Sequence, residues 1–209
     1  MQKSIVVSTP EADFSALAYK EDFKDSIKKV YDLGFDAVEL AIKDPNLVDT
    51  EDIKGIVDKY NLPVVALGTG QAYGEEGLSF TDPEPEIREK AVTRIKDQMD
   101  FARFLGETVV IIGLIRGKIE EGLSPNQAEN FFMECMRECA DYNQDITLVI
   151  EPINRYETDL YNDLLSTRDI IEKIDKSSVK LMIDTFHMNI EDADMLENMR
   201  QVKDYLAHV

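Results

Sequence analysis

Short, almost continuous runs of apolar residues alternate along the chain with longer stretches in which apolar residues recur every three or four positions. The runs are typical of strands buried on both faces, and the longer stretches of amphipathic helices. Within 86–105, for example, one helical face carries Ile87, Ala91, Ile95, Met99 and Ala102. We predict six strands and the start of a seventh, at 4–8, 37–41, 63–68, 108–115, 146–153, 179–186 and 206–209.

Polar residues and glycines indicate where several helices begin and end. Ser124 is followed three residues on by Gln127, which is the pattern of a capping box. Ser166 predicts a second helix start of the same kind. Gly34 and Gly106 directly follow helical segments, and we expect them to terminate those helices.

Strands that alternate with helices predict right-handed crossovers and a parallel sheet. A nucleotide-binding doubly wound sheet should have a glycine-rich turn after its first strand, but the segment VVSTPEADF contains no glycine. We therefore expect an α/β fold of the (β/α)8 barrel type, forming a single domain over 1–209. A barrel of about 250 residues averages about 31 residues per unit. The 209 residues thus supply six units and the start of a seventh strand, and we expect a fragment of a longer barrel.

The composition disfavours several classes of protein. The net charge is −19, with 23 basic and 42 acidic residues, which disfavours a nucleic-acid partner because such a protein needs a basic face. The N-terminus lacks the apolar core of a signal peptide and no segment approaches a membrane span, so we expect a cytoplasmic protein without a membrane partner. Cys135 and Cys139 share a helical face with apolar neighbours, which predicts reduced core cysteines.

Carboxylates follow the apolar runs at equivalent points of two neighbouring units. In a barrel the carboxyl ends of the strands surround one open face, where function collects. Glu39 ends the second predicted strand, Glu151 the fifth, and Asp184 with His187 the sixth. Buried carboxylates are costly unless they are paired or bound to metal. An oxygen-rich set with one or two imidazoles suits Mg²⁺ or Mn²⁺, with Co²⁺ as a further option.

Each of these side chains also has a purely structural interpretation. Glu151 could pair with Arg155, and Asp184 could cap the segment that follows it. His187 could be a histidine whose hydrogen bonds are satisfied in the core. Glu157, in the polar segment after the fifth strand, could be a solvated carboxylate, and Glu39 could form an ion pair with Lys43. The coincidence of Glu151 and Asp184 one repeat apart favours the metal site.

Two segments resemble sequence motifs of a known family. Residues 151–158 read EPINRYET, and residues 184–189 read DTFHMN. They resemble the E-P-x-N-R-[FY]-E and D-T-F-H-M-N motifs of the ketose 3-epimerase branch of the xylose isomerase-like barrel family. The resemblance extends over the whole chain, through 34–39 and the last predicted strand.

The resemblance implies a role for each matching residue. Glu151 is implied to be both a metal ligand and the catalytic acid/base, and Asp184 a second metal ligand. Glu157 and His187 match residues that contact sugar oxygens beside the metal. Glu39 resembles a carboxylate near the pocket, and we expect it to contact the substrate.

Two further ligands of the family have no counterpart in these 209 residues. The third is the second histidine of an H-x-H motif on strand seven. His208 matches the first histidine, so that ligand would follow Val209. The fourth, a strand-eight glutamate, is the other half of the acid/base pair. The chain is thus expected to carry half of the metal shell and, by itself, to be inactive.

The resemblance implies a metal-dependent isomerase that interconverts ketoses by proton transfer through an enediolate. A hydroxypyruvate isomerase, an inosose dehydratase and a non-catalytic carbohydrate-binding barrel remnant remain open, as does a homo-oligomer. The family's DNA-repair endonucleases need a histidine-rich metal cluster, and the chain has two histidines. Free sugars are favoured over phosphorylated ones because no clear anion site is present. The segment 70–74 is expected to reach the pocket and read the substrate.

Overall fold

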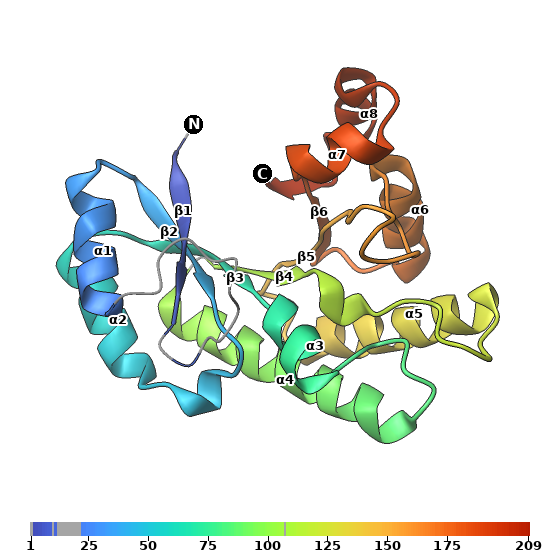
Figure 1. Cartoon of the computed structure of the whole chain (residues 1–209), viewed down its shortest axis with the longest axis horizontal. Helices are drawn as coiled ribbons and strands as arrows, with labels where there is room; N and C mark the ends of the chain where they lie inside the picture. The colour runs from blue at the N-terminus through green and yellow to red at the C-terminus, as the bar shows by residue number, and fades with distance from the viewer. Residues whose placement is uncertain (1, 10, 12–21, 107) are drawn as a thin grey trace.

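The computed structural model describes residues 2–9, 11, 22–106 and 108–209. Within these residues, seven parallel strands form one sheet in chain order. The sheet curls into a half-barrel that is open between β1 and β7, and helices cover its outer surface (Figure 1). This confirms the incomplete α/β barrel predicted from the sequence. The strands are β1 (Ser4–Ser8), β2 (Ala37–Ala41), β3 (Val64–Gly68), β4 (Val109–Ile112), β5 (Leu148–Ile150), β6 (Val179–Met182) and β7 (Leu206–His208).

At least one helix follows each strand from β1 to β6 and returns the chain to the start of the next strand. Two short 3-10 segments, η1 (Pro45–Leu47) and η2 (Leu114–Arg116), follow β2 and β4. The α-helices are α1 (Phe23–Asp32), α2 (Thr50–Lys59), α3 (Gly70–Glu76), α4 (Pro85–Leu105), α5 (Pro125–Tyr142), α6 (Leu164–Ile174), α7 (Thr185–Glu191) and α8 (Met195–Val202). None of the helices formed by the described residues is both long enough and apolar enough to cross a membrane.

Most of the predicted helix boundaries are confirmed. Ser124 and Gln127 form a reciprocal capping box at the start of α5. Gly34 and Gly106 follow α1 and α4 with φ angles of 76° and 125°, which only glycine adopts without steric cost. The start predicted at Ser166 is wrong. The carboxylate of Asp163 accepts hydrogen bonds from the second and third backbone amides of α6, so this helix begins earlier.

The later strands are shorter than their apolar runs predicted. After β4 the chain turns at Gly113 into η2, and after β6 it turns within two residues into α7. Apolar residues of these runs that lie outside the strands are buried all the same: Ile115, after β4, belongs to the large core, and Ile153, after β5, is 2% exposed. The segment 70–74, treated as a loop in the sequence, lies within α3.

Apolar side chains pack on both faces of the sheet. In β4, Val110 and Ile112 belong to the large core between sheet and helices. Ile111 points the other way, into a small cluster inside the half-barrel with Ala66, Val149 and Met182. This inner cluster forms an apolar floor beneath the strand ends. Cys135 and Cys139 are buried in the outer core as free thiols, which confirms their predicted structural role.

Candidate functional site

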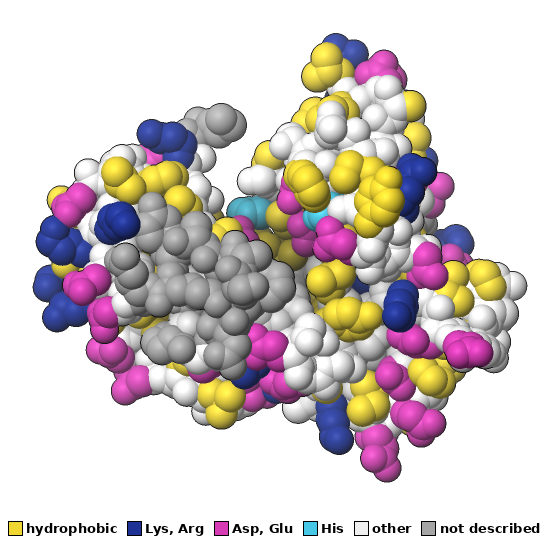
Figure 2. Space-filling model, viewed as in Figure 1, with side chains coloured by type: hydrophobic (Ala, Val, Ile, Leu, Met, Phe, Trp, Pro, Cys, Tyr) yellow, Lys and Arg dark blue, Asp and Glu magenta, His cyan; other side chains and the backbone are white. Residues whose placement is uncertain are grey.

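The carboxyl ends of the strands surround a cavity of about 260 Å³. Histidine and acidic side chains gather in this hollow between the two arms of the half-barrel (Figure 2). The described residues that line it include three carboxylates and no lysine or arginine. Its polar lining residues are Glu39, Thr69, Gln71, Glu151, Glu157 and His187.

Glu151 follows the last residue of β5, and its backbone amide donates to the carbonyl of Ile112 on β4 at 3.2 Å. Its side chain is only 16% exposed. The missing side chain of Gly113 leaves space for its carboxylate, since a Cβ at that position would lie 3.0 Å from Oε2 of Glu151. The fold therefore holds this carboxylate in a narrow slot beside β4.

Burial raises the pKa of Glu151 to about 7. The guanidinium of Arg116 opposes this shift, whereas the charges of Asp184, Glu39 and Glu157 add to it. Since a lone buried carboxylate is costly, a cation in the cavity would stabilise the ionised form of Glu151.

Arg116 is a fully buried cation behind the cavity, and none of the sequence motifs pointed to it. Its guanidinium donates to the carbonyls of Gly113 at 3.1 Å and Leu160 at 3.1 Å, which ties the segments after β4 and β5 together. Burial lowers the pKa of Arg116 to about 10, and the charge of Glu151 counteracts that shift. An arginine directly after a strongly apolar run was a signal that could have revealed it.

The two carboxylate oxygens of Asp184 have different surroundings. Oδ1 accepts a hydrogen bond from the backbone amide of Phe186 at 2.7 Å and so caps α7. Oδ2 lies 3.9 Å from Nε2 of His187. The structural interpretation of Asp184 as a cap is therefore confirmed, yet its second oxygen still faces the cluster.

His187 is oriented by Asn154. The backbone amide of Asn154 donates to Nδ1 of His187 at 3.3 Å, and its side-chain Nδ2 lies 2.8 Å from the same atom. Since Nδ1 accepts, the hydrogen-bond network places the imidazole proton on Nε2. Nε2 lies 3.8 Å from Oε1 of Glu151, which is too long for a hydrogen bond. His187 thus presents an N–H group to the space between the carboxylates.

Glu151, Asp184 and His187 form a group that could hold a metal ion, because one ligand atom from each lies within 4.8 Å of the others. The two carboxylates fit a hard divalent cation such as Mg²⁺ or Mn²⁺. A protonated Nε2 has no free lone pair for a metal, so the tautomer set by Asn154 favours His187 as a hydrogen-bond donor instead.

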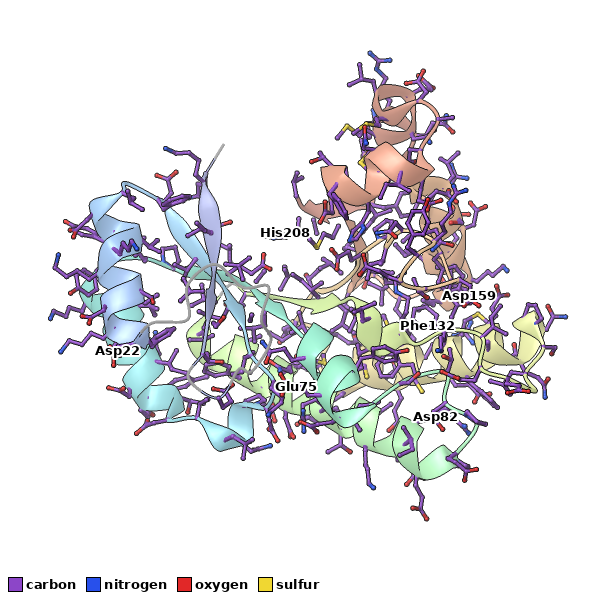
Figure 3. The ribbon with its side chains drawn as sticks, in the orientation of Figure 1. Asp22, Glu75, Asp82, Phe132, Asp159 and His208 are labelled. Carbon is purple, nitrogen blue, oxygen red and sulfur yellow. The ribbon has the colours of Figure 1, made fainter. Side chains whose placement is uncertain are left out.

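The structure brings Glu157 and Glu39 to the same cavity. Oε1 of Glu157 accepts from Nδ2 of Asn154 at 2.8 Å. Oε2 of Glu39 lies 3.2 Å from Nε2 of His208, which reaches across from β7 at the open side (Figure 3). All five site residues predicted from the sequence therefore lie together.

Two alternative ion pairs weighed in the sequence are not formed. Arg155 donates to Glu191 at 2.6 Å rather than pairing with Glu151, and Lys43 pairs with Glu75 at 2.8 Å while Glu39 lies against His208. The carboxylates of Glu39 and Glu151 thus remain directed to the cavity.

Comparisons with known proteins agree with the motifs. The family described as xylose isomerase-like TIM barrel matches residues 27–209. The L-ribulose 3-epimerase of Methylomonas sp. is 29% identical over 184 residues, covering 84% of this chain and 61% of that protein. The D-psicose 3-epimerase of Enterocloster bolteae is 27% identical over 198 residues, covering 90% and 64%. The similarity confirms the resemblance to ketose 3-epimerases.

A solved structure shares the fold over the whole chain. The D-allulose 3-epimerase from Methylomonas sp., crystallised in complex with D-allulose, matches with a TM-score of 0.81 at 26% identity. The match covers 100% of this chain and 72% of that one. In the two sequence comparisons, the chain spans less than two thirds of the length of the L-ribulose 3-epimerase and of the D-psicose 3-epimerase.

Proposed function

The chain belongs to the xylose isomerase-like TIM barrel family, and from this premise we propose that the protein is a metal-dependent ketose epimerase. One observation carries the proposal: Glu151, Asp184 and His187 converge within 4.8 Å at the ends of neighbouring strands. The similarity to enzymes named ketose, psicose and ribulose 3-epimerases supports the choice of substrate class.

Glu151 and Asp184 would hold the divalent cation, with Mn²⁺ or Mg²⁺ preferred and Co²⁺ an alternative. When bound, such a cation supplies Lewis-acid polarisation of a carbonyl, which acidifies the neighbouring C–H group. Glu151 would remove that proton, and the absence of a side chain at Gly113 leaves room for its carboxylate beside the cavity.

His187 and Glu157 would orient the sugar. The Nε2–H of His187 would donate to a sugar oxygen between the carboxylates, and the carboxylate of Glu157 would accept from a hydroxyl. Because Asn154 contacts both residues, the two contacts keep a fixed separation. Glu39 would contact the ligand from β2.

Inversion of a carbon centre requires acid/base groups on both faces of the substrate. Glu151 supplies one face. The resemblance implies that a glutamate on strand eight supplies the other face and that a histidine on strand seven is a further metal ligand. Neither residue lies within the 209 residues. We propose that residues 1–209 belong to a single xylose isomerase-like barrel domain, in which Glu151 and Asp184 would form half of the metal shell.

A free sugar fits the cavity better than a sugar phosphate. Three carboxylates line the cavity, and none of its described lining residues is basic, so a phosphate group would meet repulsion without a compensating cation. A neutral polyol, in contrast, can donate its hydroxyls to carboxylate oxygens.

The experiment uses the protein expressed from its complete gene, loaded with Mn²⁺ and incubated in deuterated water with D-allulose, L-ribulose, hydroxypyruvate or an inosose. We expect deuterium at the epimerised carbon of a recovered ketose, and none with Glu151→Gln. Recovery of the ketoses without deuterium contradicts the proposal. Turnover of hydroxypyruvate or dehydration of the inosose would assign one of the related reactions instead.

A further inference from the structure

Gln71 is buried in the wall of the cavity. It is the second residue of α3, its side chain is 5% exposed, and it lines the cavity. Neither Oε1 nor Nε2 of its amide has a partner among the described residues. Gln98 offers a partial contrast: it is also buried and its Oε1 has no partner among the described residues, but its Nε2 donates to the carbonyl of Ile42 at 3.1 Å.

An unpaired buried amide destabilises the free protein, since burial removes the water that would otherwise bind it. An apolar residue of similar size would remove this cost. A polar side chain in this position is therefore explained by a ligand that restores its hydrogen bonds.

The neighbouring residues hold Gln71 in place. The hydroxyl of Thr69 donates to the carbonyl of Ile111 on β4 at 2.6 Å, which anchors the turn between β3 and α3. The candidate metal ligands come from the ends of β5 and β6, beyond the intervening β4. A ligand held by them would meet Gln71 on another wall of the same cavity.

The chemistry of the amide selects the class of ligand group. One carboxamide offers an acceptor and two donors, and so it matches a hydroxyl, which both donates and accepts. It carries no charge, and it lies in a wall without basic side chains among the described residues. We infer that Gln71 binds a hydroxyl of the sugar chain away from the reacting carbon and thereby determines which ketose is accepted. This inference rests on the proposed function.

The first test needs no substrate. It compares thermal unfolding of wild type, Gln71→Met and the matched control Gln98→Met, using the protein from its complete gene. Gln71→Met should raise Tm by about 2–4 °C because it removes an unpaired amide. Gln98→Met should lower Tm because it leaves the carbonyl of Ile42 without its donor. A lower Tm in both variants overturns the inference, since Gln71 then has partners in the free protein.

The second test measures KM and kcat of the Mn²⁺-loaded wild type and Gln71→Met with D-allulose and its single-deoxy analogues. In the wild type, at least one deoxy analogue should show a KM about tenfold higher, the loss expected for one hydrogen bond to a buried group. In Gln71→Met that difference should disappear, with Mn²⁺ affinity unchanged. Gln98→Met should discriminate as the wild type does.

The outcomes separate this inference from the proposed function. If the wild type turns over ketoses and Gln71→Met still discriminates against the same analogue, Gln71 does not read that hydroxyl and only this inference falls. If the wild type binds Mn²⁺ but neither binds nor converts a ketose, the proposed function and this inference fall together.

Discussion

Asn154 and His187 are joined by hydrogen bonds that determine what the histidine can do. The backbone and side-chain amides of Asn154 both approach Nδ1 of His187, at 3.3 and 2.8 Å. The orientation of the Asn154 amide is itself fixed, because its Oδ1 accepts from the backbone amide of Tyr156 at 2.9 Å and its Nδ2 donates to Glu157. One asparagine thus sets the tautomer of His187 and the position of Glu157.

Asn154→Asp should reverse that tautomer. The new carboxylate cannot donate to Nδ1, and it favours a proton there, which leaves a lone pair on Nε2. We predict a fall in kcat/KM of about 10- to 100-fold, the effect typical of losing a partner that orients a site histidine. Nitrogen-15 NMR of the ring should show the proton moving from Nε2 to Nδ1. Asn126→Asp, at an exposed position, makes the same change of charge and should leave kcat/KM and the tautomer of His187 unaltered. An unchanged tautomer in Asn154→Asp contradicts the assignment.

His187→Leu distinguishes a hydrogen-bond donor from a metal ligand. If Nε2 carries a proton, the variant should bind Mn²⁺ within about threefold of wild type while KM for the ketose rises about tenfold, the loss of one hydrogen bond. Calorimetric titration with Mn²⁺ and steady-state kinetics measure the two effects. A hundredfold loss of Mn²⁺ affinity would instead make His187 a ligand.

Gly113→Ala should displace the carboxylate of Glu151, because the added Cβ would lie 3.0 Å from Oε2. We predict at least tenfold weaker Mn²⁺ binding, comparable to the loss of a supporting contact, with far-UV circular dichroism unchanged. Gly55→Ala is the control. That glycine lies in α2, and a Cβ added there would meet nothing within 4 Å, so alanine should stabilise the helix by about 0.5–1 kcal/mol. Wild-type Mn²⁺ affinity in Gly113→Ala would show that Glu151 has room to move.

The raised pKa of Glu151 predicts a dependence of stability on pH in the metal-free protein. A carboxyl whose pKa is about 7 when folded and near 4.5 when unfolded binds more protons in the folded state between these values. Its contribution to stability is full below about pH 4.5 and is lost as pH rises through 7. Relative to wild type, Glu151→Gln should therefore gain up to about 3 kcal/mol between pH 5 and pH 8.

Urea unfolding with a chelator present measures this difference. Glu138→Gln removes a carboxylate that is 60% exposed and paired with Lys96, so its stability should run parallel to that of the wild type across the same range. Parallel curves for wild type and Glu151→Gln would mean that burial does not raise the pKa of Glu151.

The fold was largely predictable because its signals are local. Apolar runs located all seven strands, and Ser124 with Gln127 marked the start of α5. Strand ends were less predictable, since a run such as 108–115 stays apolar after the chain has left the sheet. Ser166 failed as a cap because Asp163, a stronger acceptor, captures the first free amides of α6.

The site was predictable only in its residue types. Strand-end position and motif resemblance selected Glu151, Asp184 and His187, and the structure brings them together. The role of Asn154 could not be foreseen, because it depends on a contact with a residue 33 positions away. The charge of Arg116 near Glu151 likewise arises only when the segments after β4 and β5 pack together.

The most direct test is a titration of Mn²⁺ into wild type, Glu151→Gln and Asp184→Asn, with free Mn²⁺ counted by electron paramagnetic resonance. Both substitutions keep the shape of the side chain and remove its charge. The protein from its complete gene should bind one Mn²⁺ per chain, and each variant should bind Mn²⁺ about a hundredfold more weakly. The control Glu138→Gln should bind Mn²⁺ as tightly as the wild type. A wild type that binds no Mn²⁺, or variants that bind it as tightly as wild type, would contradict the metal site on which the proposed epimerase rests.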